Sequence, residues 1–284
     1  MSQLPLSNIQ VLNLAYNLPG PAAAARLQQF GARVVKVEPL HGDPFAGLCP
    51  AWYAALSAGQ QVLRLDLKRP AGRQQLDALL AASDLLITAS RPSSLQRAGL
   101  DWETLHARFP QLCQTAIVGS PAPRQELPGH DLTYQAAAGL LQPPALPRSL
   151  LADLGGAEQT VSTGLALLLG RAGGQGGGYA EVSLEEAALA FAAPLHYGLT
   201  APGGLLGGGL PVYNLYPTRQ GWLAAAALEP QFWQRLAEEL GLDSPQAPYE
   251  AFAQAFLERT ALEWEQWAAG RDLPLLALRE TITS

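Results

Sequence analysis

The chain has 284 residues, of which 48% are hydrophobic and 15% are charged, and its formal net charge is −6. A chain of this length and composition can bury a sizeable core and divide into two lobes. Its acidity and the lack of any run of Lys or Arg argue against a general nucleic-acid binder. Individual arginines must therefore meet any anionic ligand.

The cysteine pattern and the N-terminus bear on the cellular compartment. Cys49 and Cys113 have neither metal-ligand nor redox spacing, and a chain of this size needs no disulfides to fold. We therefore expect a reducing, cytoplasmic compartment and no bound metal. No basic segment precedes an apolar one at the N-terminus, and no apolar stretch reaches about eighteen residues. We expect neither secretion nor contact with a membrane.

Strand and helix patterns alternate in the first half of the chain. A strand over 9–14, an Ala-rich helix over 21–30 and a strand over 31–37 make a βαβ opening. The alternation continues with strands over 62–67, 84–88 and 112–118 and helices over 70–82 and 101–109. This order predicts an α/β fold with a Rossmann-like, doubly wound parallel sheet and ligands beyond the carboxyl ends of its strands. The segment 17–21 lacks the Gly-x-Gly-x-x-Gly of a dinucleotide site.

The second half contains two glycine-rich segments. The first glycine-rich segment, 170–178, follows a predicted helix over 161–169. It could bend over a ligand, but the favoured interpretation is a flexible surface loop. A strand and a helix follow over 179–193. The second segment, 200–209, is the expected linker between a large domain, 1–199, and a small α+β domain, 210–284. The small domain is expected to hold a hairpin over 213–216 and 221–227, then helices over 230–240, 247–259 and 262–269.

Acid and base groups stand in three segments punctuated by glycine and proline. His130 lies in the first, Asp153 in the second and Glu229 in the third. A histidine and a carboxylate are what a proton-transfer enzyme needs. Structural explanations stay open, because His130 and Asp131 can cap a helix over 132–141, Asp153 can cap a later helix, and Glu229 can open one.

Ordered matches over nearly the whole chain resemble the family III CoA-transferases (CaiB/BaiF-like), closest to the branch of alpha-methylacyl-CoA racemases. The matching segments are 11–14, 19–21, 30–39, 42–43, 65–68, 72–73, 84–87, 91–92, 95–100, 129–131, 152–153 and 228–233. Each match is weak alone, but together they are specific. The resemblance implies the family III fold with a CoA-binding large domain, an acyl-CoA thioester as substrate, no permanently bound cofactor, and a homodimer.

The resemblance also assigns catalytic roles. In racemase-like members an aspartate and a histidine exchange the proton alpha to a thioester carbonyl, and the matching residues are Asp153 and His130. A glutamate that supports the histidine matches Glu229. In transferase members the aspartate is instead a nucleophile that forms an anhydride with the acyl group. Backbone N–H groups of Gly155 and Gly156, expected at a helix start, would stabilise the enolate oxygen.

Coenzyme A has its own candidate residues. Arg97 matches a phosphate ligand of the family, with Arg91, Arg64 and Lys68 as weaker candidates.

Several departures bear on CoA binding. Gln60 and Gln61 stand where many members have a basic pair, and Pro39 stands where many have a basic residue, which weakens the expected grip on the phosphates. The chain ends at Ser284, so the small domain is expected to be C-terminally shortened.

Three functions stay open. The first is a racemase or epimerase of 2-substituted acyl-CoA thioesters, which predicts solvent deuterium at the alpha carbon. The second is a CoA-transferase with an aspartyl nucleophile, which predicts a trappable acyl-enzyme. The third is a non-catalytic or repurposed paralogue, against which tight CoA binding would count.

Overall fold

The computed structural model describes residues 4–242, 244 and 247–279 of the chain. Its internal contacts divide the chain into two compact units, Met1–Ala192 and Ala193–Ser284. The sequence places the end of the large domain at residue 199, whereas this division falls after Ala192, within the helix α9 (Leu184–His196). Each unit is described by itself.

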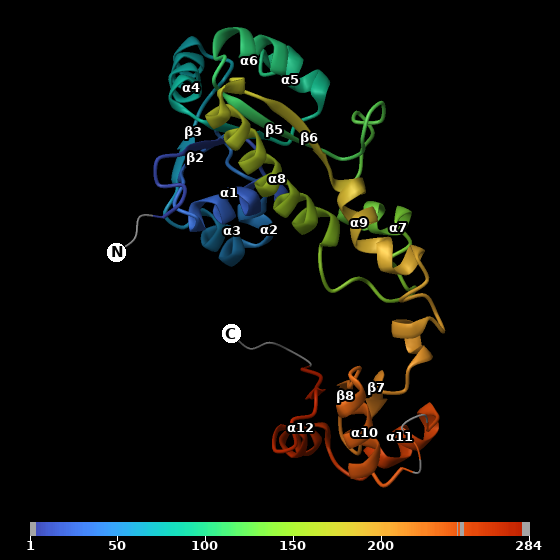
Figure 1. Cartoon of the computed structure of the whole chain (residues 1–284). Helices are drawn as coiled ribbons and strands as arrows, with labels where there is room; N and C mark the ends of the chain where they lie inside the picture. Colours follow the sequence, from blue (N-terminus) through green and yellow to red (C-terminus); the bar gives the residue numbers. More distant parts are fainter. Residues whose placement is uncertain (1–3, 243, 245–246, 280–284) are drawn as a thin grey trace. The chain divides into compact units, whose positions relative to one another are not determined.

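The first unit is built on a six-stranded parallel sheet in the order β3-β2-β1-β4-β5-β6 (Figure 1). The strands are β1 (Gln10–Asn13), β2 (Arg33–Glu38), β3 (Gln61–Arg64), β4 (Leu85–Thr88), β5 (Cys113–Val118) and β6 (Tyr179–Ser183). This is the strand order of the doubly wound fold, so the α/β prediction is confirmed. The order reverses between β1 and β4, where such folds place their ligands.

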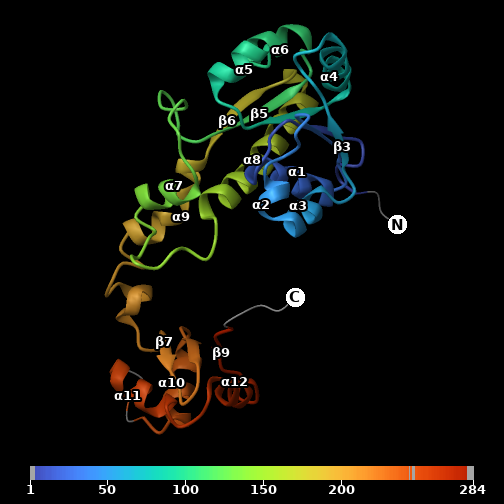
Figure 2. The same ribbon diagram turned by 180° about the vertical axis from the view of Figure 1, so that it is seen from behind.

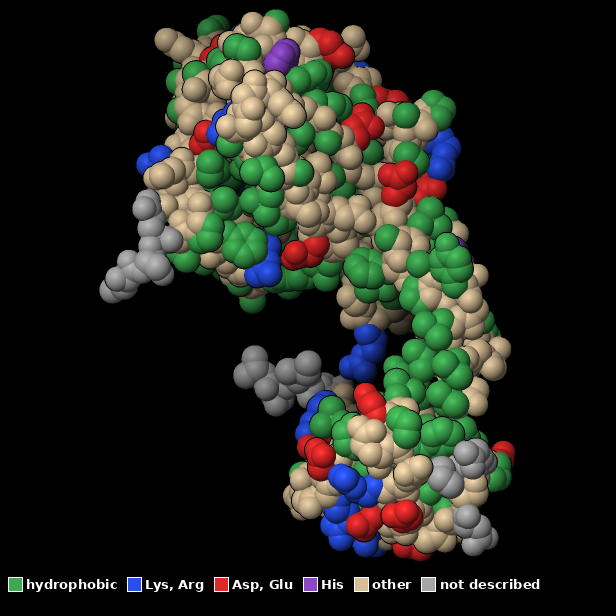
Figure 3. Space-filling model, viewed as in Figure 1, with side chains coloured by type: hydrophobic (Ala, Val, Ile, Leu, Met, Phe, Trp, Pro, Cys, Tyr) green, Lys and Arg blue, Asp and Glu red, His purple; other side chains and the backbone are tan. Residues whose placement is uncertain are grey.

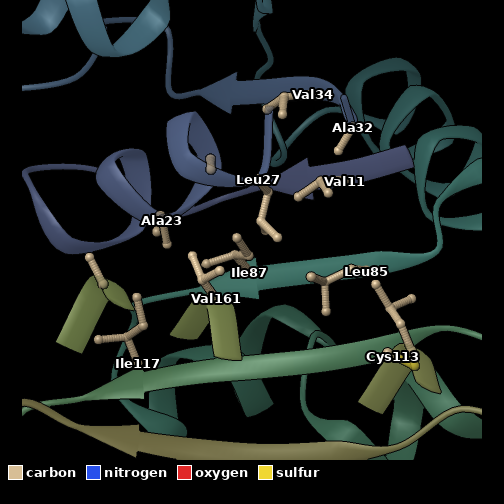
Figure 4. Close-up of a cluster of buried hydrophobic side chains, with 14 residues drawn as sticks. Val11, Ala23, Leu27, Ala32, Val34, Leu85, Ile87, Cys113, Ile117 and Val161 are labelled. Atoms are coloured by element: carbon tan, nitrogen blue, oxygen red, sulfur yellow. The ribbon is translucent and has the colours of Figure 1, made fainter. Parts of the chain in front are cut away.

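Helices cover both faces of this sheet (Figure 2). The helices are α1 (Pro19–Gln29) and α8 (Leu151–Gly170) on one face and α4 (Pro70–Ala82), α5 (Pro92–Ala98) and α6 (Trp102–Arg108) on the other. Successive strand residues point to opposite faces, so Val11 joins one core cluster and Leu12 the other. Figure 4 shows Ile87 of the sheet beside Leu27 of α1 and Val161 of α8.

The sequence patterns do not predict three helices of the first unit: α2 (Phe45–Leu48), α3 (Pro50–Ser57) and α5. The first is a single turn, and α3 has no buried residue, so neither shows the periodic apolar face on which sequence prediction depends. The strand β3 ends at Arg64 rather than at the predicted residue 67. The residues that follow it are therefore left to line a cavity.

The helix α8 begins at Leu151, ten residues before the predicted start at 161. Gly155 and Gly156 resemble a turn in the sequence, but both are buried in this helix. A Cβ added at Gly155 would overlap the Phe191 ring, and one added at Gly156 would overlap the side chain of Leu184. The two glycines therefore let α8 and α9 pack closely together.

The predicted glycine-rich loop at 170–178 is partly helical. Its first residues continue the turns of α8 through η1 (Arg171–Gln175), in which Gly174 leaves helical geometry with a φ of 91°. No residue from 170 to 178 lines cavity A or cavity B, which lie at the carboxyl ends of the strands.

The second unit contains a three-stranded sheet in the order β7-β8-β9. Its elements are η2 (Leu205–Gly209), β7 (Tyr213–Pro217), β8 (Trp222–Ala226), α10 (Pro230–Glu239), α11 (Tyr249–Phe256), α12 (Ala261–Ala269) and β9 (Leu275–Ala277). The antiparallel pairing of β7 with β8 confirms the predicted hairpin. Tyr216, Phe252, Phe256 and Trp264 are buried in its core.

Candidate active site

Two adjoining cavities open at the carboxyl ends of the parallel strands. Cavity A, of about 450 Å³, is lined by residues that follow β1, β4, β5 and β6. Cavity B, of about 610 Å³, is lined by residues at the ends of β1, β2, β3 and β4. Both cavities include Tyr16 and Ser90, which follow β1 and β4. They therefore meet at the point where the strand order reverses.

His130 lines cavity A and is the N-cap residue of α7 (Asp131–Ala137). The Thr133 hydroxyl accepts a hydrogen bond from the His130 N–H at 3.1 Å and donates one to its carbonyl oxygen at 2.8 Å. Both bonds use backbone atoms of His130, while the residue is exposed. The predicted helix start is therefore present, and it also positions the imidazole at the cavity.

Asp153 also lines cavity A, from the first turn of α8, and is half-buried. Burial and the negative charge of Asp131 raise the pKa of the Asp153 carboxyl to about 6, although the charge of His130 acts in the opposite direction. A carboxylate with this pKa is a stronger base than an ordinary aspartate and is still mostly ionised at neutral pH. That combination suits a general base.

Asp131 is a buried carboxylate that joins α7 to α8. Its Oδ1 accepts a hydrogen bond from the Asp153 N–H at 3.0 Å, and its Oδ2 accepts one from Gln135 Nε2 at 2.5 Å. Gln135 Nε2 also donates to the Ser149 carbonyl oxygen at 3.0 Å. The sequence predicts a helix cap for Asp131 and includes it in the matching segment 129–131, but only its place next to His130 indicates a role in the site.

Gly155 and Gly156 do not stand at a helix start, so that expectation is wrong. Helix α8 begins at Leu151, so the N–H groups of both glycines belong to its internal i to i−4 hydrogen bonds. Their contribution is the close packing of α8 against Phe191 and Leu184.

Comparison with known proteins identifies the family. Residues 6–280 match the sequence profile of CoA-transferase family III. This protein belongs to CoA-transferase family III. The predicted family is confirmed.

Members of family III similar to this chain carry different activities in their names. The chain is 31% identical to the alpha-methylacyl-CoA racemase of Mus musculus, over 98% of this chain and 79% of the racemase. It is 28% identical to the succinyl-CoA–D-citramalate CoA-transferase of Chloroflexus aurantiacus, over 84% of this chain and 65% of that protein. A CAIB/BAIF family protein from Brucella suis shares the fold, with a TM-score of 0.83 at 23% identity over 99% of this chain and 85% of that one.

Three of the four family III CoA-binding candidates lie at cavities. Arg91 lines cavity A, and Lys68 lines cavity B. Lys68 and Arg97 together line cavity C, of about 670 Å³, where Arg97 donates a hydrogen bond to the Ser94 hydroxyl at 2.9 Å. Arg64 lines none of these three cavities, and its Nε is 3.8 Å from Glu38 Oε2.

Of the residues that replace basic groups of family III, Pro39 lines cavity B, whereas Gln60 and Gln61 line none of the three cavities. Gln60 donates a hydrogen bond from Nε2 to the Leu56 carbonyl oxygen at 2.8 Å. Gln61 begins β3. The basic side chains among the residues that line cavity B are those of His41 and Lys68.

Glu229 belongs to the second unit and is the N-cap residue of α10. Its carbonyl oxygen accepts hydrogen bonds from the N–H groups of Phe232 at 2.9 Å and Trp233 at 3.0 Å, and Pro230 occupies the first helical position. Glu229 therefore opens a helix, which is the structural explanation that the sequence leaves open for it. Its support of His130 stays a prediction.

The surface and the side-chain clusters give two further observations. Within the described ranges, no three His, Cys, Asp or Glu side chains form a group that could hold a metal ion, and no helix there is long and apolar enough to cross a membrane. Charged side chains are scattered over the visible face of the first unit, without an extended basic patch (Figure 3).

Proposed function

We propose that this protein is a racemase or epimerase of 2-substituted acyl-CoA thioesters. The observation that carries the proposal is that His130 and an Asp153 carboxyl with a pKa of about 6 line the same cavity. The similarity to the mouse alpha-methylacyl-CoA racemase supports it. The acyl group would occupy cavity A, and the coenzyme would extend over cavities B and C past Lys68 and Arg97.

The two residues would act from opposite faces of the alpha carbon. The Asp153 carboxylate removes the alpha proton, and the electron pair of the broken C–H bond moves into an enolate thioester. The protonated imidazole of His130 then returns a proton to the same carbon, which forms the new C–H bond with inverted configuration. Asp153 ends protonated and His130 neutral, and exchange with solvent restores both groups.

A CoA-transferase is the second candidate. The similarity to the citramalate CoA-transferase supports it, because transferases of this family use an aspartate at the position of Asp153. In this reaction the Asp153 carboxylate attacks the thioester carbonyl and the CoA thiolate leaves, which forms an acyl anhydride. His130 has no necessary part in that step, so it distinguishes the two candidates.

Isotope exchange with separate enantiomers tests the proposal. Each enantiomer of a 2-methylacyl-CoA is incubated with the enzyme in D₂O, and alpha-carbon deuterium is measured by mass spectrometry. A two-base enzyme labels both enantiomers; Asp153→Asn loses the labelling of one, and His130→Gln loses that of the other. Absence of labelling, with hydroxylamine trapping an acyl group on Asp153, would establish the transferase instead.

We also propose a cytoplasmic homodimer. Helix α9 exposes apolar side chains, with Leu189 at 39% and Phe191 at 52%, and such surface is often buried between subunits. The free thiols Cys49 and Cys113 suit a reducing compartment. Light scattering at micromolar concentration tests the dimer, and a mass of one chain would contradict it. Fractionation of cells tests the compartment.

A further inference from the structure

The proposed reaction places negative charge on the thioester oxygen, and a hydrogen-bond donor is needed to stabilise it. The backbone groups nearest Asp153 are already engaged. The Asp153 N–H donates to Asp131, and the N–H groups of Gly155 and Gly156 are bonded within α8. Side-chain donors that line cavity A are the alternative.

Tyr134 lies on α7 one helical turn after His130, so the two residues share a side of this helix. It is 6% exposed and lines cavity A together with His130 and Asp153. Its hydroxyl is held between Gly119 and Gly129, because a Cβ added at either glycine would overlap the phenol oxygen. The two glycines thus make room for the hydroxyl at the wall of the cavity.

The Tyr134 hydroxyl makes no hydrogen bond to any of the residues that the structure describes, and it is not among the buried atoms that lack a partner. It therefore remains available to a ligand. Two other donors around cavity A are engaged, since Gln125 Nε2 donates to Glu181 at 3.2 Å and the His130 N–H donates to Thr133. Tyr16, the other phenol of this cavity, is 41% exposed.

We propose that the Tyr134 hydroxyl donates a hydrogen bond to the thioester oxygen of the substrate and stabilises the enolate. The inference rests on the proposed function and adds a catalytic residue to it. The proton stays on Tyr134 throughout, so the residue polarises the carbonyl without changing its own charge. Burial, with the negative charges of Asp153 and Glu185, raises the pKa of the phenol and keeps it protonated.

Tyr134→Phe tests the role, because it removes the hydroxyl and keeps the ring. We expect kcat for alpha-deuterium exchange to fall about 10²-fold, the usual effect of losing one such donor, for both enantiomers, with little change in acyl-CoA affinity. Tyr197→Phe is the matched control, since Tyr197 is 91% exposed and lines neither cavity A nor cavity B. In infrared spectra of a bound ¹³C-labelled thioester, the carbonyl stretch should move to higher frequency in Tyr134→Phe.

Gly119→Ala gives an independent test that does not rely on Tyr134→Phe alone. The Cβ added at Gly119 would overlap the Tyr134 hydroxyl oxygen but stay 3.2 Å from the nearest ring carbon, so it would displace mainly the hydroxyl. Alpha-deuterium exchange should therefore slow when this change is made in the wild type, and should not slow further when it is made in Tyr134→Phe. Equal losses in both backgrounds would overturn the role of the hydroxyl. If the wild type is active, and Tyr134→Phe has the same rate and the same carbonyl stretch, the inference about Tyr134 is wrong while the proposed function stands. A wild-type protein that binds no acyl-CoA would overturn both the inference and the proposed function.

Discussion

The Asp153 N–H donates a hydrogen bond to Asp131 Oδ1 at 3.0 Å, and this bond joins the first turn of α8 to the first turn of α7. The contact acts on Asp153 in two ways. It fixes the backbone of the residue, and it brings a second carboxylate close enough to raise the pKa of the first. Burial is the larger cause of the raised pKa, and the contact with Asp131 adds to it while holding the residue in position.

Asp131→Asn should lower the pKa of Asp153 from its value of about 6, because the substitution removes a negative charge that disfavours ionisation. For the enantiomer from which Asp153 takes the proton, exchange requires the carboxylate, so the rate rises with pH up to that pKa. The rising limb should move to lower pH in the variant. The measurement is the pH dependence of kcat/KM for alpha-deuterium exchange.

The control is Glu158→Gln, which changes an exposed carboxylate of the same helix. Its rising limb should coincide with that of the wild type. An unshifted limb in Asp131→Asn would show that Asp131 does not act on Asp153 through charge.

Asp153→Asn should stabilise the protein at alkaline pH. The pKa of the carboxyl is about 6 in the folded protein against an ordinary value of 3.8, so ionisation destabilises the folded state above pH 6. That penalty disappears as the pH falls through 6 towards 4. With allowance for partial exposure, the variant should gain about 1–3 kcal/mol in the free energy of unfolding at pH 8 and almost nothing at pH 4.

Urea denaturation at pH 8, 6 and 4 measures this difference. Glu238→Gln, at an exposed position of α10, is the control and should show no comparable trend. A destabilised Asp153→Asn at pH 8 would mean that the ionised carboxylate stabilises the fold.

The sheet could be predicted from sequence because its strands and helices carry strong local periodicity. The start of α8 could not, because Gly155 and Gly156 are stabilised in a helix by contacts with Phe191 and Leu184, which lie about thirty residues further along the chain. Local patterns contain no information about such partners.

The candidate site could likewise be predicted only in part. His130 and Asp153 were identified by resemblance, and the structure brings them to one cavity. The role of Asp131 depends on burial and on its bond to Asp153, and neither is visible in the order of residues. The order of residues alone does not favour Lys68 over Arg64. The structure distinguishes them, because β3 ends at Arg64 and Lys68, which follows the strand, lines cavity B.

Gly155→Ala should destabilise the protein, although alanine is the better helix former. The new methyl group would overlap Cε2 of the Phe191 ring, and overpacking costs about 1–3 kcal/mol, with the lower end expected because this ring is exposed and can shift. Phe191→Leu should recover part of the loss by making room. Gly173→Ala is the matched control, because nothing lies within 4 Å of its added Cβ, and its unfolding temperature should not fall. Equal effects of the two alanines would contradict the packing argument.

Arg97→Ala and Lys68→Ala should each weaken CoA binding about tenfold, whereas Arg64→Ala should have little effect. Arg97 and Lys68 line cavity C together, while Arg64 lines none of the three cavities and lies near Glu38. Loss of one charge-assisted hydrogen bond to a phosphate costs about 1.5–3 kcal/mol, and partial exposure puts the expected loss at the lower end. Isothermal titration with CoA measures all three variants.

Salt dependence and a smaller ligand sharpen this experiment. If Arg97 and Lys68 bind phosphate, their effect should shrink at high ionic strength, because salt screens exposed charges. Pantetheine lacks the nucleotide phosphates, so its binding should be the same in wild type and in both variants. Equal weakening by Arg64→Ala would place the phosphates near the end of β3 instead of at cavity C. Absence of CoA binding by the wild type at millimolar ligand would favour a repurposed member of family III, because such a protein keeps the fold without the coenzyme site.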